Sequence, residues 1–392
     1  MLNTPIYLDH HATTKPDPRV LDAIWPYFTE KFGNAASLSH RFGWEASDAV
    51  DLARGRVADV IGAESREIVF TSGATESNNL AIKGAAWALE KKGRHLVSAT
   101  TEHRAVLDPL RRLERAGWGL TLVEPDEYGM IHAAAVAEAI RDDTVLVSVM
   151  AANNEVGTIN PIAEIGRICS ERGVVFHTDA TQAVGKIAID VAADGIGLLS
   201  LSAHKMYGPK GIGALYVRRR ERPVRLTPLF DGGGHESGVR SGTPAVPLIV
   251  GLGAACEIAR AEWQSESTRV LELRERLHAA IVRGVPNVRL NGHPTARLAA
   301  NLNLSFPGVD GEALMMAMRE VAVSSGAACS SAEPEPSHVL LAIGLDEDLA
   351  RASLRFGLGR WTTAEEVDYA AQAVAAAVRR LTSLPSTWSS RK

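Results

Sequence analysis

The stretch VVFHTDATQAVGKIAIDVAADGIGLLSLSAHK, residues 174–205, indicates the fold class most clearly. It contains two short runs of large apolar and β-branched residues, 174–177 and 198–201, which are typical of buried strands. An ionisable residue that can act in binding or catalysis follows each run: Asp179 comes after the first and Lys205 after the second. Because ligands bind at the carboxyl ends of strands in parallel α/β sheets, the stretch predicts a ligand site between Asp179 and Lys205.

Similar short runs alternate with amphipathic segments between residues 67 and 217. One such segment, 162–172, carries Ile162, Ile165 and Cys169 on one face at helical spacing. This alternation predicts an α/β domain with a mostly parallel sheet that helices cover on both faces. The other expected strands are residues 68–70, 95–98, 120–123 and 145–149.

The pattern changes in the last part of the chain. Glycines and two prolines in residues 232–247 predict a loop followed by a helix, and residues 268–282 predict a longer helix. Beyond them we expect a smaller α+β unit with strands at 301–306, 321–324 and 353–358 and a closing helix at 363–384. The expected domains are an N-terminal segment of the small domain at 1–15, a large domain at 16–260 and a small C-terminal domain at 261–392.

Composition narrows the range of functions. The net charge is −4 on a balanced background of 42 basic and 46 acidic residues, which gives no reason to expect direct nucleic-acid binding. The apolar runs are too short to span a membrane, and the first residues lack the basic and apolar regions of a signal peptide. Three cysteines are too few for a disulfide framework. We therefore expect a cytoplasmic protein with no membrane partner.

Three clusters of polar residues predict a cofactor site. The segment TSGATESN, residues 71–78, follows a strand and opens a helix, whose free amides and dipole favour a phosphate. Taken singly, this segment and Asp179 could each be a helix cap, and Lys205 could be a surface lysine. Together they supply what pyridoxal phosphate (PLP) requires. The lysine forms the Schiff base, the aspartate keeps the pyridine nitrogen protonated, and the helix N-terminus with its hydroxyls holds the phosphate.

With these residues the chain resembles the cysteine desulfurases of the NifS/IscS type, in the class V aminotransferase group of fold-type I PLP enzymes. The resemblance covers almost the whole chain. It is densest at residues 7–9, 12–14, 39–44, 70–77, 101–103, 153–155, 179–182, 204–205, 207–216, 232–236, 240–243, 324–331 and 355–360. It implies a mostly parallel seven-stranded sheet covered by helices, a smaller α+β domain and a homodimer.

The resemblance also implies roles within the cofactor site. Lys205 would form the Schiff base and move the Cα proton of the substrate, while Asp179 would hold the pyridine nitrogen. Gln182 would donate to the ring hydroxyl, and His103 would stack on the ring and act as an acid–base group for the substrate thiol. The implied phosphate ligands are Ala74, Thr75, Ser202 and His204, with Thr243 reaching in from the second subunit.

For the substrate, L-cysteine, the resemblance implies that Asn34 and Arg355 hold the carboxylate, a task suited to a bidentate guanidinium. Asn154 would contact both cofactor and substrate. One departure from the family is the pair His10-His11, which replaces less basic residues and has no role that the sequence assigns.

The three cysteines fall into two classes. Cys169 and Cys256 lie on apolar helix faces and are expected to be buried and inert. Cys329 lies among small polar residues that predict an accessible loop. The resemblance implies that Cys329 attacks the substrate sulfur and keeps it as a persulfide while alanine leaves. The same thiolate could transiently ligate an iron–sulfur cluster.

The sequence does not identify the molecule that accepts the sulfur. An iron–sulfur scaffold, a tRNA-thiolation protein and a DNA-sulfur-modification protein are all compatible with such an enzyme, and the tail after residue 384 is shorter than the one with which housekeeping relatives dock a scaffold. Three alternative functions also remain: a selenocysteine lyase, another class V aminotransferase that would not need Cys329, and a catalytically silent binding protein.

Overall fold

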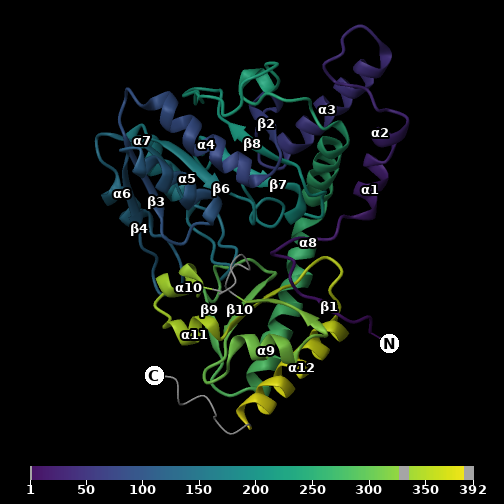
Figure 1. Cartoon of the computed structure of the whole chain (residues 1–392), viewed down its shortest axis with the longest axis vertical. Helices are drawn as coiled ribbons and strands as arrows, with labels where there is room; N and C mark the ends of the chain where they lie inside the picture. Colours follow the sequence, from purple (N-terminus) through teal and green to yellow (C-terminus); the bar gives the residue numbers. More distant parts are fainter. Residues whose placement is uncertain (1, 326–334, 384–392) are drawn as a thin grey trace.

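The structure, a computed structural model, describes residues 2–325 and 335–383 (Figure 1). Its larger half is built on a seven-stranded sheet in the order β2-β8-β7-β6-β5-β3-β4. The strands are β2 (Ile68–Thr71), β3 (His95–Ala99), β4 (Gly119–Val123), β5 (Thr144–Ser148), β6 (Val175–Asp179), β7 (Leu198–Ser202) and β8 (Gly213–Val217). Within this sheet, β8 alone runs opposite to the other strands. The predicted mostly parallel sheet is confirmed.

Helices cover both faces of this sheet, as the alternation of strands and helices predicts. On one face, α4 (Ala74–Leu89) and α5 (Arg104–Arg115) share a hydrophobic core with the strands. On the other face, α3 (Arg41–Asp59), α6 (Ala133–Ala139) and α7 (Ile162–Arg172) share another. Helix α7 has the predicted bounds and ends where Gly173 takes a left-handed conformation, with φ of 65°.

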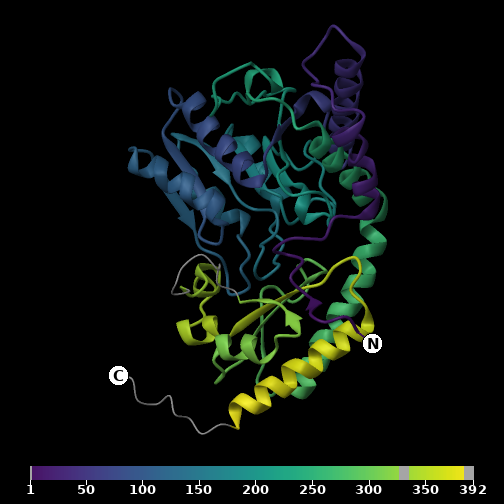
Figure 2. The same cartoon turned by 45° about the vertical axis from the view of Figure 1, so that its right-hand side comes forward.

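A single helix of 39 residues, α8 (Val246–Gly284), connects the two halves. Figure 2 shows it running from the large sheet down to α12 (Ala364–Thr382). The sequence predicts a helix after the loop at 232–247 and a separate, longer helix at 268–282, which the structure joins into one. Residues 249–256 are all buried, so their side chains show no single apolar face with a period of 3.6 residues.

The smaller half contains an antiparallel sheet in the order β12-β13-β10-β9. Its strands are β9 (Arg289–Asn291), β10 (Asn301–Ser305), β12 (Ser324–Ser325) and β13 (Ser353–Gly357). The N-terminal strand β1 (Ile6–Tyr7) joins this half by pairing in parallel with β11 (Val321–Ala322). The hydrophobic core changes within α8, between Ala259 and Val270. The domain limits expected at residues 15 and 260 stay a prediction.

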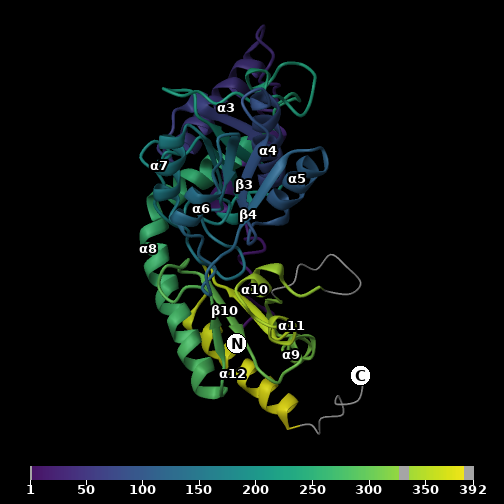
Figure 3. The same cartoon turned by 90° about the vertical axis from the view of Figure 1, so that its left-hand side faces the viewer.

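The remaining short elements are α1 (Pro18–Ile24), α2 (Pro26–Thr29), α9 (Gly311–Ala317), α10 (His338–Ala342), α11 (Glu347–Arg351) and the 3-10 turns η1 (Ser65–Glu67), η2 (Ala203–Lys205) and η3 (Glu236–Gly238). Within residues 2–325 and 335–383, no helix combines the length and hydrophobicity needed to cross a membrane. Figure 3 shows loops of the larger half meeting the smaller half, and the candidate site lies at this level.

Candidate active site

A cavity of about 610 Å³ lies where the two halves meet. Its larger part is formed by residues that end or follow β5, β6 and β7 and by the first turn of α4, and strand β13 contributes from the smaller half. Ligands bind at such carboxyl strand ends in α/β proteins. The cavity brings together these predicted site residues: Ala74, Thr75, His103, Asn154, Asp179, Gln182, Ser202, His204, Lys205 and Arg355.

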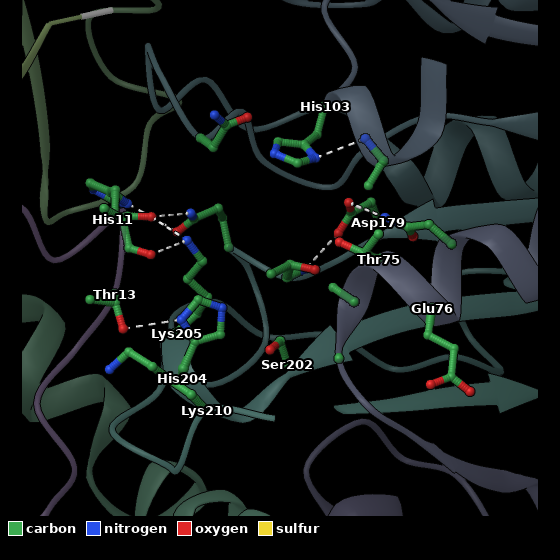
Figure 4. A pocket seen from close by; sticks show the side chains of 18 of the residues that line it. His11, Thr13, Thr75, Glu76, His103, Asp179, Ser202, His204, Lys205 and Lys210 are labelled. Atoms are coloured by element: carbon green, nitrogen blue, oxygen red, sulfur yellow. Dashed lines mark hydrogen bonds between the residues drawn. The ribbon is translucent and has the colours of Figure 1, made fainter. Parts of the chain in front are cut away.

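Lys205 lies in η2, directly after β7, and its amine approaches the N-terminal segment (Figure 4). Its Nζ donates to the backbone carbonyls of His11 at 2.5 Å and Ala12 at 2.7 Å. Burial, and secondarily the positive charge of Arg355, lowers the pKa of Lys205 to about 8. A larger share of the amine is therefore neutral near physiological pH, which a nucleophile that forms a Schiff base requires.

Asp179 ends β6, and its buried carboxylate accepts hydrogen bonds from two neutral donors. The side-chain amide of Asn78 donates to one oxygen at 2.7 Å, and the backbone N–H of Thr181 donates to the other at 3.0 Å. These donors fix the carboxylate without neutralising its charge. The arrangement suits a partner for a protonated pyridine nitrogen.

The first turn of α4 forms an anion-binding end of the cavity, lined by Ala74 and Thr75. No side chain of the described residues caps this helix, which leaves its first N–H groups for a ligand. Ser202 and His204 line the same cavity, and Nδ1 of His204 lies 3.1 Å from Oγ1 of Thr13. Burial, with the positive charge of neighbouring lysines, lowers the pKa of His204 to about 4, so its ring is neutral at physiological pH.

His103 caps the N-terminus of α5, because its Nδ1 accepts the backbone N–H of Ala105 at 3.0 Å. The ring points into the cavity in Figure 4. Burial lowers the pKa of His103, so the imidazole is neutral at physiological pH. Since Nδ1 accepts, Nε2 carries the hydrogen in the neutral ring. His103 therefore offers the cavity a neutral group that can exchange a proton.

Arg355 brings a guanidinium to the cavity from β13 in the smaller half. Its Nη1 donates to the backbone carbonyl of Asn154 at 2.8 Å, and its Nη2 forms an ion pair with Asp9 at 2.9 Å. Its Nε is buried without a hydrogen-bond partner among the described residues. A guanidinium held in this way suits the recognition of a carboxylate.

Two predicted site residues lie outside this cavity. Asn34 is exposed, and its side chain accepts the backbone N–H of Ala36 at 2.9 Å. Thr243 is exposed as well and lines a separate hollow together with Arg240. Neither reaches the cavity of its own chain, so their expected roles stay predictions that require a second subunit.

Cys329 lies outside the described residues, but the chain on either side of its segment is anchored beside the cavity. On the N-terminal side, Ser324 of β12 lies opposite Arg355 of β13. On the C-terminal side, Nε2 of His338 lies 2.9 Å from the backbone carbonyl of Glu102. Cys329 follows Ser324 by five residues, a span of at most about 18 Å.

The other two cysteines are buried, as predicted. Burial raises the pKa of Cys169 to about 12 and raises that of Cys256 as well, so neither forms a thiolate readily. Across the part of the chain that the structure describes, no group of three histidine, cysteine or acidic residues could hold a metal ion. The expected contact of Cys329 with an iron–sulfur cluster falls outside that part.

Two polar residues near the cavity have no role that sequence reasoning assigns. His11 and Lys186 both contact the side-chain oxygen of Gln182. The unusual pair His10-His11 was one available signal. The other was a lysine within a run of small and apolar residues, four positions after Gln182.

Comparisons with known proteins agree with this geometry. The Aminotransferase class-V family model matches residues 6–370. A relative named cysteine desulfurase IscS, from Anaeromyxobacter dehalogenans (strain 2CP-C), is 58% identical over 380 residues, which are 97% of this chain and 94% of the relative. Another with the same name, from Ehrlichia chaffeensis (strain Arkansas), is 51% identical over 387 residues, covering 99% of this chain and 94% of the relative.

Solved structures give the same result. A NifS-like protein superposes with a TM-score of 0.89 at 36% identity, over 96% of this chain and all of its own. SspA, solved in complex with cysteine, has a TM-score of 0.81 at 40% identity, over 91% of this chain and 100% of its own. DndA from Streptomyces lividans has a TM-score of 0.78 at 39% identity, over 89% of this chain and 98% of its own. The chain therefore belongs to the aminotransferase class-V family and, within it, to the cysteine desulfurases.

Proposed function

We propose that the protein converts L-cysteine into L-alanine and holds the released sulfur as a persulfide on Cys329, in a homodimer. The observation that carries this proposal is the cavity in which Lys205, Asp179 and His103 meet the guanidinium of Arg355. The names of the relatives support the activity, and the complex of SspA with cysteine supports the substrate.

Enzymes of this family use PLP, and the residues of the cavity fit it. Lys205 would hold the aldehyde carbon and Asp179 the pyridine nitrogen, while His103 would stack on the ring. The phosphate would lie at the first turn of α4 with Ser202 and His204, as the uncapped helix end favours. Bound PLP supplies an electron sink for the electrons of the substrate Cα.

The protein's own groups bind the substrate and move its protons. Arg355 holds the carboxylate, assisted by Asn154, and thereby fixes the Cα–H bond relative to Lys205. Lys205, whose pKa is lowered to about 8, takes the Cα proton. His103, neutral and directed into the cavity, exchanges the proton of the substrate thiol.

The sulfur transfer is a displacement at the substrate sulfur. The Cys329 thiolate forms a bond to that sulfur while the bond from sulfur to Cβ breaks. The electron pair of the broken bond stays with the carbon side, which is then protonated and leaves as alanine. The products balance as alanine and a Cys329 persulfide, with no external oxidant or reductant.

A dimer is supported by the exposed large apolar side chains of residues 21–52, which we call the exposed apolar surface. Trp25 and Phe32 are each 67% exposed, and Leu38 is 82% exposed. We infer that these side chains gather into a patch, which would be unusual on a monomer. The other exposed large apolar side chains of this segment are Leu21, Phe28, Phe42, Trp44 and Leu52.

The loop that carries Thr243 is anchored to α3, the helix that also carries Phe42, Trp44 and Leu52. Glu236, seven residues earlier, pairs with Arg54 of α3 at 2.7 Å. Thr243 is exposed on the loop that follows this anchor, so it is free to contact a second copy of the chain. We infer that Asn34 and Thr243 complete the site of the partner subunit.

The acceptor of the persulfide is proposed to be another protein. The relatives named IscS and DndA support sulfur delivery, and the choice between an iron–sulfur scaffold, a tRNA-thiolation protein and a DNA-sulfur-modification protein stays open. The cytoplasmic location expected from the sequence also stays a prediction.

Incubation of the purified protein with L-cysteine and a thiol reductant tests the activity. We expect alanine and sulfide in equal amounts, without any keto acid. An aminotransferase would instead need a keto acid and would release no sulfide, and that result would overturn the proposal. Competition between cysteine and selenocysteine measures which of the two the site prefers.

A further inference from the structure

Gln182, which we expect at the ring hydroxyl of PLP, is held by two side chains that no step above uses. Its Oε1 lies 3.1 Å from Nζ of Lys186 and 3.0 Å from Nδ1 of His11. Its Nε2 donates to the backbone carbonyl of His11 at 2.9 Å. Both lone pairs of the amide oxygen are thus engaged by protein groups. Gln182 and His11 are buried, and both line the cavity.

These contacts decide which way the amide of Gln182 faces. A lysine ammonium can only donate, so Lys186 selects the oxygen of the amide rather than its nitrogen. The amide nitrogen has two hydrogens, and one of them goes to the carbonyl of His11. The second hydrogen is left for an acceptor in the cavity. Burial keeps the pKa of His11 well below its usual range, so its ring is neutral. Because the amide oxygen can only accept, this neutral ring donates from Nδ1.

We propose that Lys186 and His11 are positioning residues that turn the amide nitrogen of Gln182 toward the ring hydroxyl of PLP. This inference rests on the proposed placement of PLP in the cavity. It gives a role to His11, the residue by which this chain departs from its family at the N-terminal segment.

The environment of Lys186 is compatible with this role. Lys186 lines a small second cavity together with His10, His11, Tyr207 and Glu266, and the charges of Lys205 and Arg355 act on it. Burial lowers the pKa of Lys186 to about 7, the positive charge of Lys205 contributes, and Glu266 opposes the shift. A lysine amine donates in either protonation state, so the bond to Gln182 persists through neutral pH.

Loss of either donor should weaken the hydrogen bond from Gln182 to the ring hydroxyl. That oxygen carries most negative charge when the Schiff base of Lys205 has lost its proton, so a weaker donor raises the pKa of the Schiff base. Loss of a positive charge at Lys186 acts in the same direction. We expect Lys186→Met and His11→Phe each to raise this pKa by roughly half to one unit, the size of one hydrogen bond.

The measurement is the visible absorption of the holoenzyme as a function of pH, without substrate, together with the rate of PLP dissociation. Lys83→Met is a matched control. Nζ of Lys83 donates to the side-chain oxygen of Asn79 at 2.7 Å, and neither residue lines the cavity. It should leave the titration unchanged. Lys186→Gln keeps a donor but loses the charge, so it should shift the titration in the same direction by less than Lys186→Met does.

Gln182→Ala separates this inference from the proposed function. In that background Lys186→Met should add less than half of the shift that it causes alone, because Lys186 acts through the amide. Fully additive shifts, or an unchanged titration in both Lys186→Met and His11→Phe, would overturn the positioning role. If Gln182→Ala itself moves neither the titration nor the dissociation rate, the placement of PLP against Gln182 fails instead. Should Lys186→Met not fold, His11→Phe and Lys186→Gln decide the question.

Discussion

Ser324 of β12 lies opposite Arg355 of β13, so the strand that leads to Cys329 is paired with the strand that presents a guanidinium to the cavity. The proposed sulfur acceptor and the proposed carboxylate site are therefore built on one small sheet. The proposed PLP ligands Lys205 and Asp179 come from the larger sheet. Any shift of one half against the other would move Arg355 and the start of the Cys329 segment together.

Lys205→Ala should abolish turnover and the absorption band of the Schiff base. The fold should survive, because Nζ of Lys205 contributes only two hydrogen bonds to backbone carbonyls. The visible spectrum after addition of PLP measures the first effect, and circular dichroism measures the second. A normal Schiff-base spectrum in the folded variant would contradict the assignment of Lys205.

The rate at which the apoenzyme binds PLP covalently should depend on the protonation of Lys205. Only the neutral amine attacks the aldehyde, so the rate should rise with pH and level off above the pKa of about 8. Arg355→Gln removes a positive charge that lowers this pKa and leaves Asp9 unpaired, so the midpoint should move to higher pH. Arg276→Gln, which breaks an exposed pair with Asp368, is the control and should leave the midpoint where it is.

The pattern of strands predicts the part of the cavity formed by Asp179, Lys205 and the first turn of α4, whereas the family resemblance supplies the expected roles of its other residues. Asp179 and Lys205 each follow a buried strand, and the topology of a parallel sheet alone brings such residues together. The contacts of Lys186 could not be predicted in this way. They depend on side chains from the turn after β6 and from the N-terminal segment, whose meeting is set by tertiary packing.

Asn34 and Thr243 show a different limit of sequence reasoning. Resemblance places them in the site, whereas the single chain leaves both exposed and outside the cavity. Residues 249–256 show a third limit, because a helix segment that is buried all round has no amphipathic period.

Arg360 should be important for stability because it joins three segments that are far apart in the sequence. It pairs with Asp17 at 2.7 Å and with Glu266 of α8 at 2.8 Å, and its guanidinium lies 4.2 Å from the ring centre of Tyr207. Arg360→Met leaves two largely buried carboxylates with fewer partners, and we expect the free energy of unfolding to fall by about 3 kcal/mol. Urea unfolding measures this change, and Arg276→Met is the exposed control that should have little effect.

The exposed apolar surface should be the dimer interface. Trp25→Glu should shift the protein to monomers in sedimentation experiments, because a buried unpaired charge opposes association. Trp87→Glu changes an exposed tryptophan of α4, outside the proposed surface, and should leave the dimer intact. A dimer that tolerates Trp25→Glu would place the interface elsewhere.

A mixture of Lys205→Ala and Thr243→Ala chains should recover activity if the sites are shared. In the mixed dimer, one site combines an intact Lys205 with an intact Thr243 of the other subunit, while the second site carries both changes. Activity should approach that of one site per dimer once subunits have exchanged. No recovery after confirmed exchange would show that each chain completes its own site.

Cys329→Ser should separate the chemistry at PLP from the transfer of sulfur. The proposed contacts of Lys205, Asp179 and Arg355 do not involve the thiol, so L-cysteine should still change the visible spectrum of the variant. No persulfide should form, because a serine hydroxyl is a far weaker nucleophile than a thiolate. Mass spectrometry after brief exposure to L-cysteine should find one added sulfur on the wild-type protein and none on the variant.

Cys169→Ala provides the matched control for this experiment. Cys169 is buried with a pKa raised to about 12, so its removal should leave the added sulfur in place and affect only stability. If Cys329→Ser released alanine at the wild-type rate, the sulfur would leave the substrate by a route independent of Cys329. If Cys169→Ala lost the added sulfur while remaining folded, Cys169 rather than Cys329 would carry the persulfide, and the proposed role of Cys329 would be wrong.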